Sequence, residues 1–202
     1  MNEEIKKPAG EPREDAALIR AFREGDKAAF DSLVLRHKDR LFNLCYRLLG
    51  DYEEANDSAQ ETFIKVYGSL KKFRFESAFS TWLYRIAVNT CKNKLKSSAF
   101  RQKRKMVPLD NPIPGNLNSP GREIRDESPS PAIAIEKKER MRIIQEAINA
   151  LPPEQKEVVT LRDIEGLSYE EVAEITGFNL GTVKSRLARA RLDLRKKLRS
   201  LV

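Results

Sequence analysis

The chain has 202 residues, of which 40% are hydrophobic and 34% are charged, so it can bury one large or two small cores under a very polar surface. No segment approaches the run of about 18 apolar residues that a membrane-spanning helix requires, and the N-terminus lacks the apolar core of a secretory signal. These features predict a cytoplasmic protein without direct membrane insertion, in which residues 1–13 form a disordered N-terminal tail.

Charge is distributed unevenly along the chain, whose net charge is +8. Seven cations and no acid lie between Lys92 and Lys105, and eight cations with one acid lie between Lys184 and Arg199. In contrast, the segment from Asp51 to Glu61 holds five acids and no base. Two basic patches and one acidic patch indicate a polyanion that is contacted twice and a separate partner for the acidic segment.

Residues 14–99 are predicted to form a first helical domain, because apolar residues recur there at helical intervals and no alternating strand pattern occurs. Two or more helices are expected before Gly50, with a turn at Gly25-Asp26. A further helix follows through "DYEEANDSAQETFIKVYGSL". Four residues mark its inward face: Ala55, Ala59, Phe63 and Val66.

The last helix of this domain is predicted over 79–96 and combines three kinds of residue. Steps of four, three and four define its apolar face: Phe79, Leu83, Ile86 and Thr90. Asn89 falls at the edge of that face beside Trp82, which is expected to pack between helices in the core. A basic stripe lies just beyond: Arg85, Lys92 and Lys96. An amide between an aromatic face and a row of cations requires an explanation beyond packing.

The cysteines and the single histidine do not indicate a reactive site. Cys45 and Cys91 lie within helical patterns and lack the spacing of metal ligands, so they are expected to be buried free thiols in a reducing cytosol. His37 lies in the charged run "LRHKDR" and is expected to have an ordinary surface role. No catalytic residue, metal site or cofactor is predicted.

Residues 100–135 are predicted to form a flexible, proline-rich linker. Six of the ten prolines of the chain lie between Pro108 and Pro131, where they prevent an uninterrupted helix. The chain is therefore expected to be all-α, with two small helical domains joined by this linker.

Residues 136–202 form the second predicted domain. Its first helix lies in "KKERMRIIQEAINAL", where five residues mark the buried side: Met141, Ile144, Ala147, Ile148 and Leu151. Pro152-Pro153 begins the next helix, which Gly166 ends.

A helix-turn-helix pattern follows in "LSYEEVAEITGFNLGTVKSRLARARLDLRKKL". Ser168 and Glu171 have the spacing of a capping box, Gly177 suits a left-handed turn, and Asn179 caps a second helix. Three residues of that second helix are expected to pack inward: Val183, Leu187 and Ala190.

The second helix of this pattern would lie in a DNA major groove, with its N-terminal residues nearest the base edges. Four residues occupy that end: Thr182, Lys184, Ser185 and Arg186. Arg189 and Arg191 are better placed for phosphates, which position a protein without reading sequence. The alternative is a solvated basic surface helix.

The sequence resembles the extracytoplasmic-function (ECF) sigma factors of the bacterial sigma-70 family, and is close to the sigma-E type. Three segments carry the resemblance, in this order: "DYEEANDSAQETFIKVY", "FRFESAFSTWLYRIAVNTCKNKL" and "LPPEQKEVVTLRDIEGLSYEEVAEITGFNLGTVKSRLARAR". It implies an alternative sigma factor that binds core RNA polymerase and directs promoter-specific transcription initiation. By resemblance, residues 14–99 are sigma region 2 and residues 136–202 are sigma region 4.

The resemblance assigns partners to both domains. The first domain would bind core polymerase and melt the promoter, and the second would bind the upstream (−35) element and the polymerase flap. The acidic segment matches the helix that docks on the clamp coiled coil of the largest polymerase subunit. The candidate residues there are Asp57, Gln60, Glu61 and Phe63. From the residues alone, a solvated acidic face remains the alternative.

The resemblance also explains the amide on the predicted helix 79–96. The loop "KKFRFES" and this helix match the reader of the downstream (−10) element, where one base of the single non-template strand turns into a pocket. Phe73 and Ile86 would supply the apolar wall, and Asn89 would read the base edge. Three cations would hold the adjacent phosphates: Arg85, Lys92 and Lys96.

The family's other features concern regulation. We expect the protein to lack the extra domain that primary sigma factors carry between these two, and to lack a long C-terminal extension. Regulation is therefore expected from an anti-sigma protein that covers the polymerase-binding surfaces.

Two other classes of protein fit parts of the sequence pattern. A helix-turn-helix regulator that is not a polymerase subunit usually carries an α/β receiver or a ligand pocket upstream, whereas the upstream half here is helical and basic at its end. An enzyme such as a serine recombinase would need a sheet-based catalytic domain, and no strand pattern exists. The acids of 51–61 lack the second cluster that a Mg²⁺ site would need. The chain is therefore not expected to be an enzyme.

Overall fold

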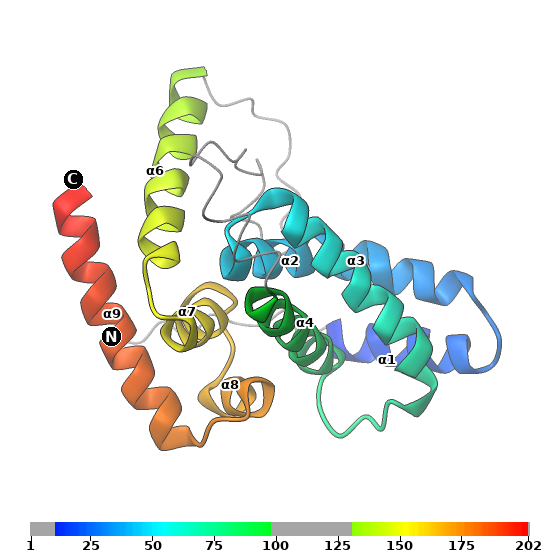
Figure 1. Cartoon of the computed structure of the whole chain (residues 1–202). Coiled ribbons are helices and arrows are strands. Elements are labelled where there is room, and N and C mark those ends of the chain that lie inside the picture. The colour runs from blue at the N-terminus through cyan, green and yellow to red at the C-terminus, as the bar shows by residue number, and fades with distance from the viewer. Residues whose placement is uncertain (1–10, 98–130, 202) are drawn as a thin grey trace.

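The computed structural model describes residues 11–97 and 131–201, and every regular element in these ranges is helical (Figure 1). In chain order the elements are α1 (Glu11–Arg23), α2 (Ala28–Leu49), α3 (Tyr52–Ser69), the 3₁₀ turn η1 (Leu70–Lys72), α4 (Phe79–Lys96), α6 (Pro131–Asn149), α7 (Pro153–Val159), the π-helical turn η2 (Thr160–Ile164), α8 (Tyr169–Thr176) and α9 (Leu180–Leu201). The predicted all-α class is confirmed. No described helix is both long and apolar enough to cross a membrane.

The N-terminal half, α1 to α4, is a bundle built around α2. Helix α2 packs against α1, α3 and α4, and α3 packs against α4. Leu33, Leu41 and Leu44 of α2 are completely buried, as is Leu83 of α4. Burying such a side chain contributes about 1.5–3 kcal/mol, so the apolar stripe of α2 contributes several kcal/mol to the stability of this half.

Most of the inward residues predicted for this half are in place. Ala55, Ala59 and Val66 of α3 are buried, and Phe63 is partly buried against the core. Cys45 and Cys91 are buried free thiols, as expected. A hydrogen bond with Cys91, together with burial, raises the pKa of Cys45 well above its ordinary value, so this thiol is unreactive near neutral pH.

The expectation that His37 has an ordinary surface role is wrong. Its side chain is buried, its Nε2 lies 2.9 Å from Oδ2 of the equally buried Asp15, and its ring packs edge-on against Phe79. The physical reason is helical periodicity, because His37 lies four residues from both Leu33 and Leu41 and so shares their inward face. Helix α1 then supplies the polar partner that a buried imidazole requires.

The C-terminal half contains the predicted helix-turn-helix. Ser168 and Glu171 form a capping box at the start of α8, and Gly177 ends that helix with φ of 75°. The Asn179 side chain accepts a hydrogen bond from the Thr182 amide at 2.8 Å, which caps α9. Val183, Leu187 and Ala190 are buried, as predicted.

The first helices of this half also follow the predicted pattern. Ile144 is half-buried, and the other four predicted inward residues are buried: Met141, Ala147, Ile148 and Leu151. The helix predicted after Pro152-Pro153 is α7 with its π-helical extension η2, and Gly166 follows it with φ of 72°.

The two halves pack against each other along a surface that we call the seam, where α4 meets α8 and where α2 meets α6, α7 and η2 (Figure 1). Gln145 Nε2 donates to the Arg47 carbonyl at 3.4 Å, and Lys156 Nζ donates to the Leu48 carbonyl at 3.3 Å. A helix leaves its last carbonyls without intrahelical partners, so the C-terminal half supplies donors to the end of α2. A Cβ at Gly50 would lie 2.7 Å from Asn149 Nδ2, so the halves approach closely there.

The predicted tail and linker lie mostly outside the described residues. Helix α1 begins at Glu11, within the predicted tail of 1–13, and α6 begins at Pro131, within the predicted linker of 100–135. The remaining domain boundaries stay predictions.

The buried position of His37 generates a test of the bundle. Replacing it (His37→Ala) should lower the free energy of unfolding by about 2–4 kcal/mol, because the change leaves a cavity and removes a partner of buried Asp15. Urea denaturation followed by circular dichroism measures this, with Lys38→Ala as an exposed neighbour that should change little. Equal stability of wild type and His37→Ala would contradict the buried assignment.

Candidate nucleic-acid and polymerase interfaces

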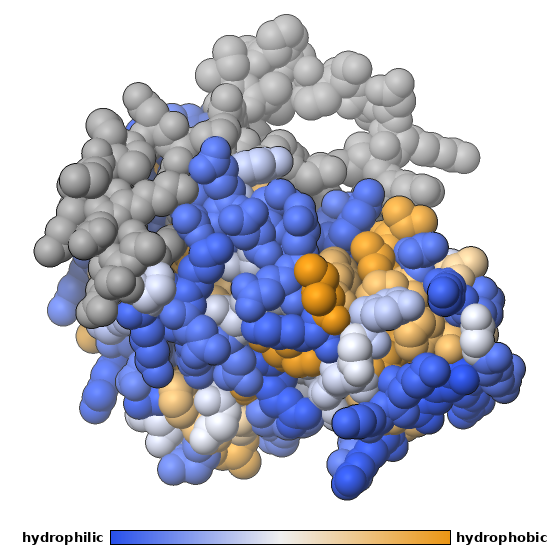
Figure 2. Space-filling model, turned by 45° about the vertical axis from the view of Figure 1, so that its right-hand side comes forward, coloured by the Kyte–Doolittle hydropathy of each residue, from blue (hydrophilic) through white to orange (hydrophobic). Residues whose placement is uncertain are grey.

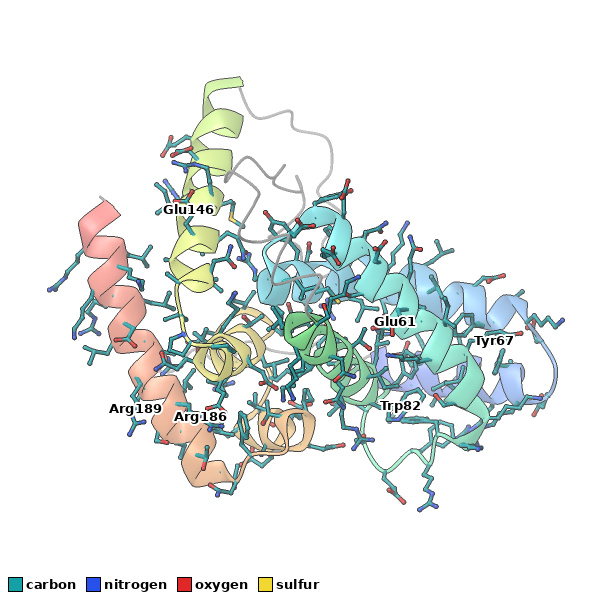
Figure 3. The ribbon with its side chains drawn as sticks, in the orientation of Figure 1. Glu61, Tyr67, Trp82, Glu146, Arg186 and Arg189 are labelled. Carbon is teal, nitrogen blue, oxygen red and sulfur yellow. The ribbon has the colours of Figure 1, made fainter. Side chains whose placement is uncertain are left out.

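Most of the predicted −35 residues lie on the outer surface of the N-terminal turns of α9, whereas Arg186 is turned toward α7. Since Val183, Leu187 and Ala190 face inward, Lys184, Ser185 and Arg189 are exposed, while Thr182 and Arg186 are half-buried. In Figure 3, Arg189 and Arg186 both extend from α9, with Arg186 on the side toward α7. One face of this helix therefore holds hydroxyls and cations together, as a groove-binding helix requires.

Arg186 is held by groups of its own half. Its Nη2 lies 2.6 Å from Glu154 Oε2 of α7, and its guanidinium carbon lies 3.9 Å from the centroid of the Phe178 ring. An arginine over an aromatic face gains cation–π stabilisation. The guanidinium is therefore engaged within its own half, and contact with a base edge would require that it leave Glu154.

The basic stripe of α4 lies partly in the seam. Lys92 Nζ is 2.7 Å from Glu157 Oε1 of α7, and Arg85 Nη1 is 3.9 Å from Glu174 Oε1 of α8. The Glu157 side chain is 4% exposed. Burial raises its pKa, and the ammonium of Lys92 opposes that rise. These acidic partners were not foreseen from the sequence, because the pairs join residues that are far apart in the chain.

The remaining predicted −10 residues differ in accessibility. Asn89 and Lys96 are exposed, Ile86 is half-buried, and Phe73 is 5% exposed. The structure thus places Ile86, Asn89 and Lys92 along α4, whereas the Phe73 ring lies within the core.

An aromatic cluster underlies the loop before α4. The Phe73 ring lies 5.1 Å from Trp82 and 6.1 Å from Phe79, measured between centroids. Trp82 packs against the core, as predicted, and Figure 3 shows it on α4. Phe75, which sequence reasoning did not single out, extends this cluster to the surface with 38% exposure. A row of aromatic residues before a helix start is the signal that could have indicated it.

The predicted polymerase-binding residues lie on α3. Asp57 and Glu61 are exposed. Asp57 Oδ2 lies 3.6 Å from Lys94 Nζ, and Glu61 Oε1 lies 2.7 Å from Lys65 Nζ. Gln60 and Phe63 border a hollow of about 450 Å³ between α2 and α3. The hollow is also lined by residues that sequence reasoning missed, among them Val34, Phe42 and Tyr52.

Apolar side chains are exposed on the same two helices. Ile64 of α3 is 72% exposed and Leu35 of α2 is 65% exposed. Figure 2 shows hydrophobic side chains gathered toward the right-hand side of that view, with hydrophilic ones between them. Acids beside an aromatic-lined hollow and exposed aliphatic residues can bind a basic, amphipathic helix.

Comparison with known families matches both halves of the chain. Sigma-70 region 2 matches residues 33–101, and Sigma-70 region 4 matches residues 141–194. Among the residues that the structure describes, no group of three or more His, Cys, Asp or Glu side chains could hold a metal ion.

Curated relatives resemble nearly the whole chain. The RNA polymerase sigma-H factor of Pseudomonas aeruginosa is 39% identical, with 94% of this chain and 96% of that protein covered. The ECF RNA polymerase sigma-E factor of Haemophilus influenzae is also 39% identical, with 93% and 97% covered. SigW of Bacillus subtilis, another ECF sigma factor, is 38% identical, with 91% and 96% covered.

Solved structures share the fold. CnrH, in complex with the cytosolic domain of CnrY, has a TM-score of 0.63 at 24% identity, with 93% of this chain and 98% of that chain covered. RpoE of Bartonella quintana, in complex with the anti-sigma factor NepR, has the same TM-score and identity, with 84% and 96% covered.

The chain belongs to the ECF sigma factors of the sigma-70 family, which direct RNA polymerase to particular promoters. The alternative of a helix-turn-helix regulator that acts apart from the polymerase is not favoured, because region 2 accompanies region 4.

Proposed function

We propose that this sigma factor divides promoter recognition between its halves. The α2 and α3 surface, with Asp57, Gln60, Glu61 and Phe63, binds the clamp coiled coil of core polymerase. The loop 73–78 and α4 melt and read the −10 element, while α9 reads the −35 element. The protein acts in the cytoplasm as a regulatory subunit and has no catalytic role of its own.

One observation carries this proposal for α4. Asn89 is exposed on a helix that has the half-buried Ile86 three residues before it and Lys92 three residues after it. An amide offers both a donor and an acceptor, so it can pair with the Watson–Crick edge of an unpaired base. A neighbouring aliphatic side chain and a cation then suit the base face and the phosphate.

An anti-sigma protein is proposed as a further partner. The Bartonella RpoE was solved in complex with the anti-sigma factor NepR, and CnrH in complex with the cytosolic domain of CnrY. In this chain the α2 and α3 surface is open in the described structure, so a partner that covers it would prevent polymerase binding. Region 4 is proposed to contact the polymerase flap.

Run-off transcription tests the proposed function. Core polymerase is supplied with a genomic DNA library, with and without the protein, and the start sites are mapped. Specific starts that depend on the protein are expected. Identical starts in both reactions would reject the role proposed for this chain, and the mapped promoters provide the DNA for the tests below.

The position of Arg186 predicts a promoter-dependent defect. Arg186→Ala should reduce initiation at promoters that depend on the −35 element, by an amount that corresponds to about 1–3 kcal/mol for one base contact. Promoters with a strong −10 element should be affected less. Run-off yields on promoters with exchanged −35 sequences measure this, and an equal loss on all of them would indicate a phosphate contact instead.

The exposed amide of Asn89 predicts a base-dependent defect. Asn89→Ala should leave thermal stability nearly unchanged, since the residue is exposed, but it should lower open-complex formation. The loss should depend on the base at one −10 position, because only the matching base loses a specific contact. Open complexes are measured on templates with each of the four bases at that position.

Asn93 offers a matched control on the same helix. Asn93→Ala removes the same exposed amide one turn later, and its effect should not depend on that base. A stable Asn89→Ala variant with undiminished base discrimination would remove Asn89 from the proposed pocket.

A further inference from the structure

Phe75 has an unusual backbone conformation. Its φ of 58° is positive, and it is the one non-glycine residue of the described chain with that property. The left-handed region suits glycine, whereas a bulky side chain there is strained. Strained residues persist where the surrounding structure holds them, and they cluster at functional sites.

The surroundings of Phe75 hold its ring at the protein surface. The ring centroid lies 5.0 Å from that of Phe73, and the guanidinium carbons of Arg23 and Arg20 lie 4.9 Å and 5.8 Å from it. Arg23 also donates to the Phe73 carbonyl, which fixes the arginine against the loop. The ring nevertheless remains 38% exposed.

Cations from the preceding segment and from α1 lie around the ring of Phe75. Lys71 and Lys72 precede it on η1, Arg74 lies directly before it, and all three are exposed. Together with the arginines of α1, they make a basic surface around one exposed ring. Proteins bind single-stranded nucleic acid with this combination, because bases stack on aromatic faces while cations hold the phosphates.

We propose that Phe75 is a stacking platform for one unpaired base of the promoter strand, beside the pocket proposed at Asn89. The inference rests on the proposed −10 function of the loop 73–78 and adds a residue to it. The base stacks on the exposed part of the ring, and the flanking phosphates meet Lys71, Lys72 and Arg74. The strained backbone is what directs the ring outward, away from the core that Phe73 occupies.

A packing role and a stacking role predict different results. If Phe75 only covers Phe73, then Phe75→Gly exposes the core and lowers stability without a specific effect on DNA. If Phe75 is a platform, Phe75→Gly relieves the backbone strain and keeps the melting temperature within a few degrees. DNA binding then decreases although the fold is intact.

The test uses holoenzyme and a promoter fragment found by run-off transcription, with its non-template strand single across the −10 element. Each base of that strand is replaced in turn by an abasic site, and affinities are measured by fluorescence anisotropy. With wild type, one abasic position should weaken binding about fivefold to a hundredfold. Phe75→Gly should weaken binding to the intact strand by a similar factor and be insensitive to that same position.

Two further variants separate the effect of the aromatic ring from the effect of side-chain size. Phe75→Tyr keeps an aromatic face and should bind like wild type, whereas Phe75→Leu keeps an apolar side chain without a ring and should bind like Phe75→Gly. The proposal would be overturned if no abasic position weakened binding by wild type more than binding by Phe75→Gly. It would also be overturned if Phe75→Leu bound DNA as tightly as wild type. Failure of wild-type holoenzyme to start transcription would instead reject the proposed function itself.

Discussion

The pairing of α4 cations with carboxylates of the C-terminal half is the interaction on which the arrangement depends. Lys92 lies 2.7 Å from Glu157, a carboxylate with 4% of its side chain exposed. Burial raises the pKa of Glu157, and the ammonium offsets part of that effect. Because the same ammonium lies on the helix that is proposed to meet the promoter strand, α4 has one set of cations for two partners.

The chemical character of the seam suits a contact that can open. Burial raises the pKa of Glu165 as well, and the Tyr84 hydroxyl is the first group that opposes this rise. Carboxylates that lose water gain little net stability from one or two partners, and polar surfaces between domains resemble transient interfaces. Each half also packs apolar residues within itself, Leu33 and Leu41 in one and Val183 and Leu187 in the other, although the buried residues of both halves form one continuous cluster. Separation of the halves therefore exposes some apolar side chains along the seam, while most of each half's own packing is retained.

Local features were predictable from the sequence, whereas long-range ones were not. The capping box at Ser168 and the left-handed Gly177 follow from rules that act within one turn of helix. His37 was assigned to the surface because its charged neighbours in the chain outweighed its helical spacing from Leu33 and Leu41. The contacts of Lys92 and Arg186 depend on how helices distant in the chain pack together. The positive φ of Phe75 could not be predicted, because a left-handed backbone is expected at glycine and not at phenylalanine. The family and its two regions were predicted correctly, since the motifs that carry them are contiguous.

The distance between the halves, with and without core polymerase, tests most directly whether α4 is used twice. Donor and acceptor dyes can be attached through Gly68→Cys on α3, where an added Cβ meets open space, and Lys196→Cys on exposed α9. Cys45 and Cys91 are buried and stay unlabelled. Single-molecule energy transfer should show one compact population in the free chain and a longer distance in the holoenzyme on promoter DNA. The same distance in both states, or an extended free chain, would contradict the account.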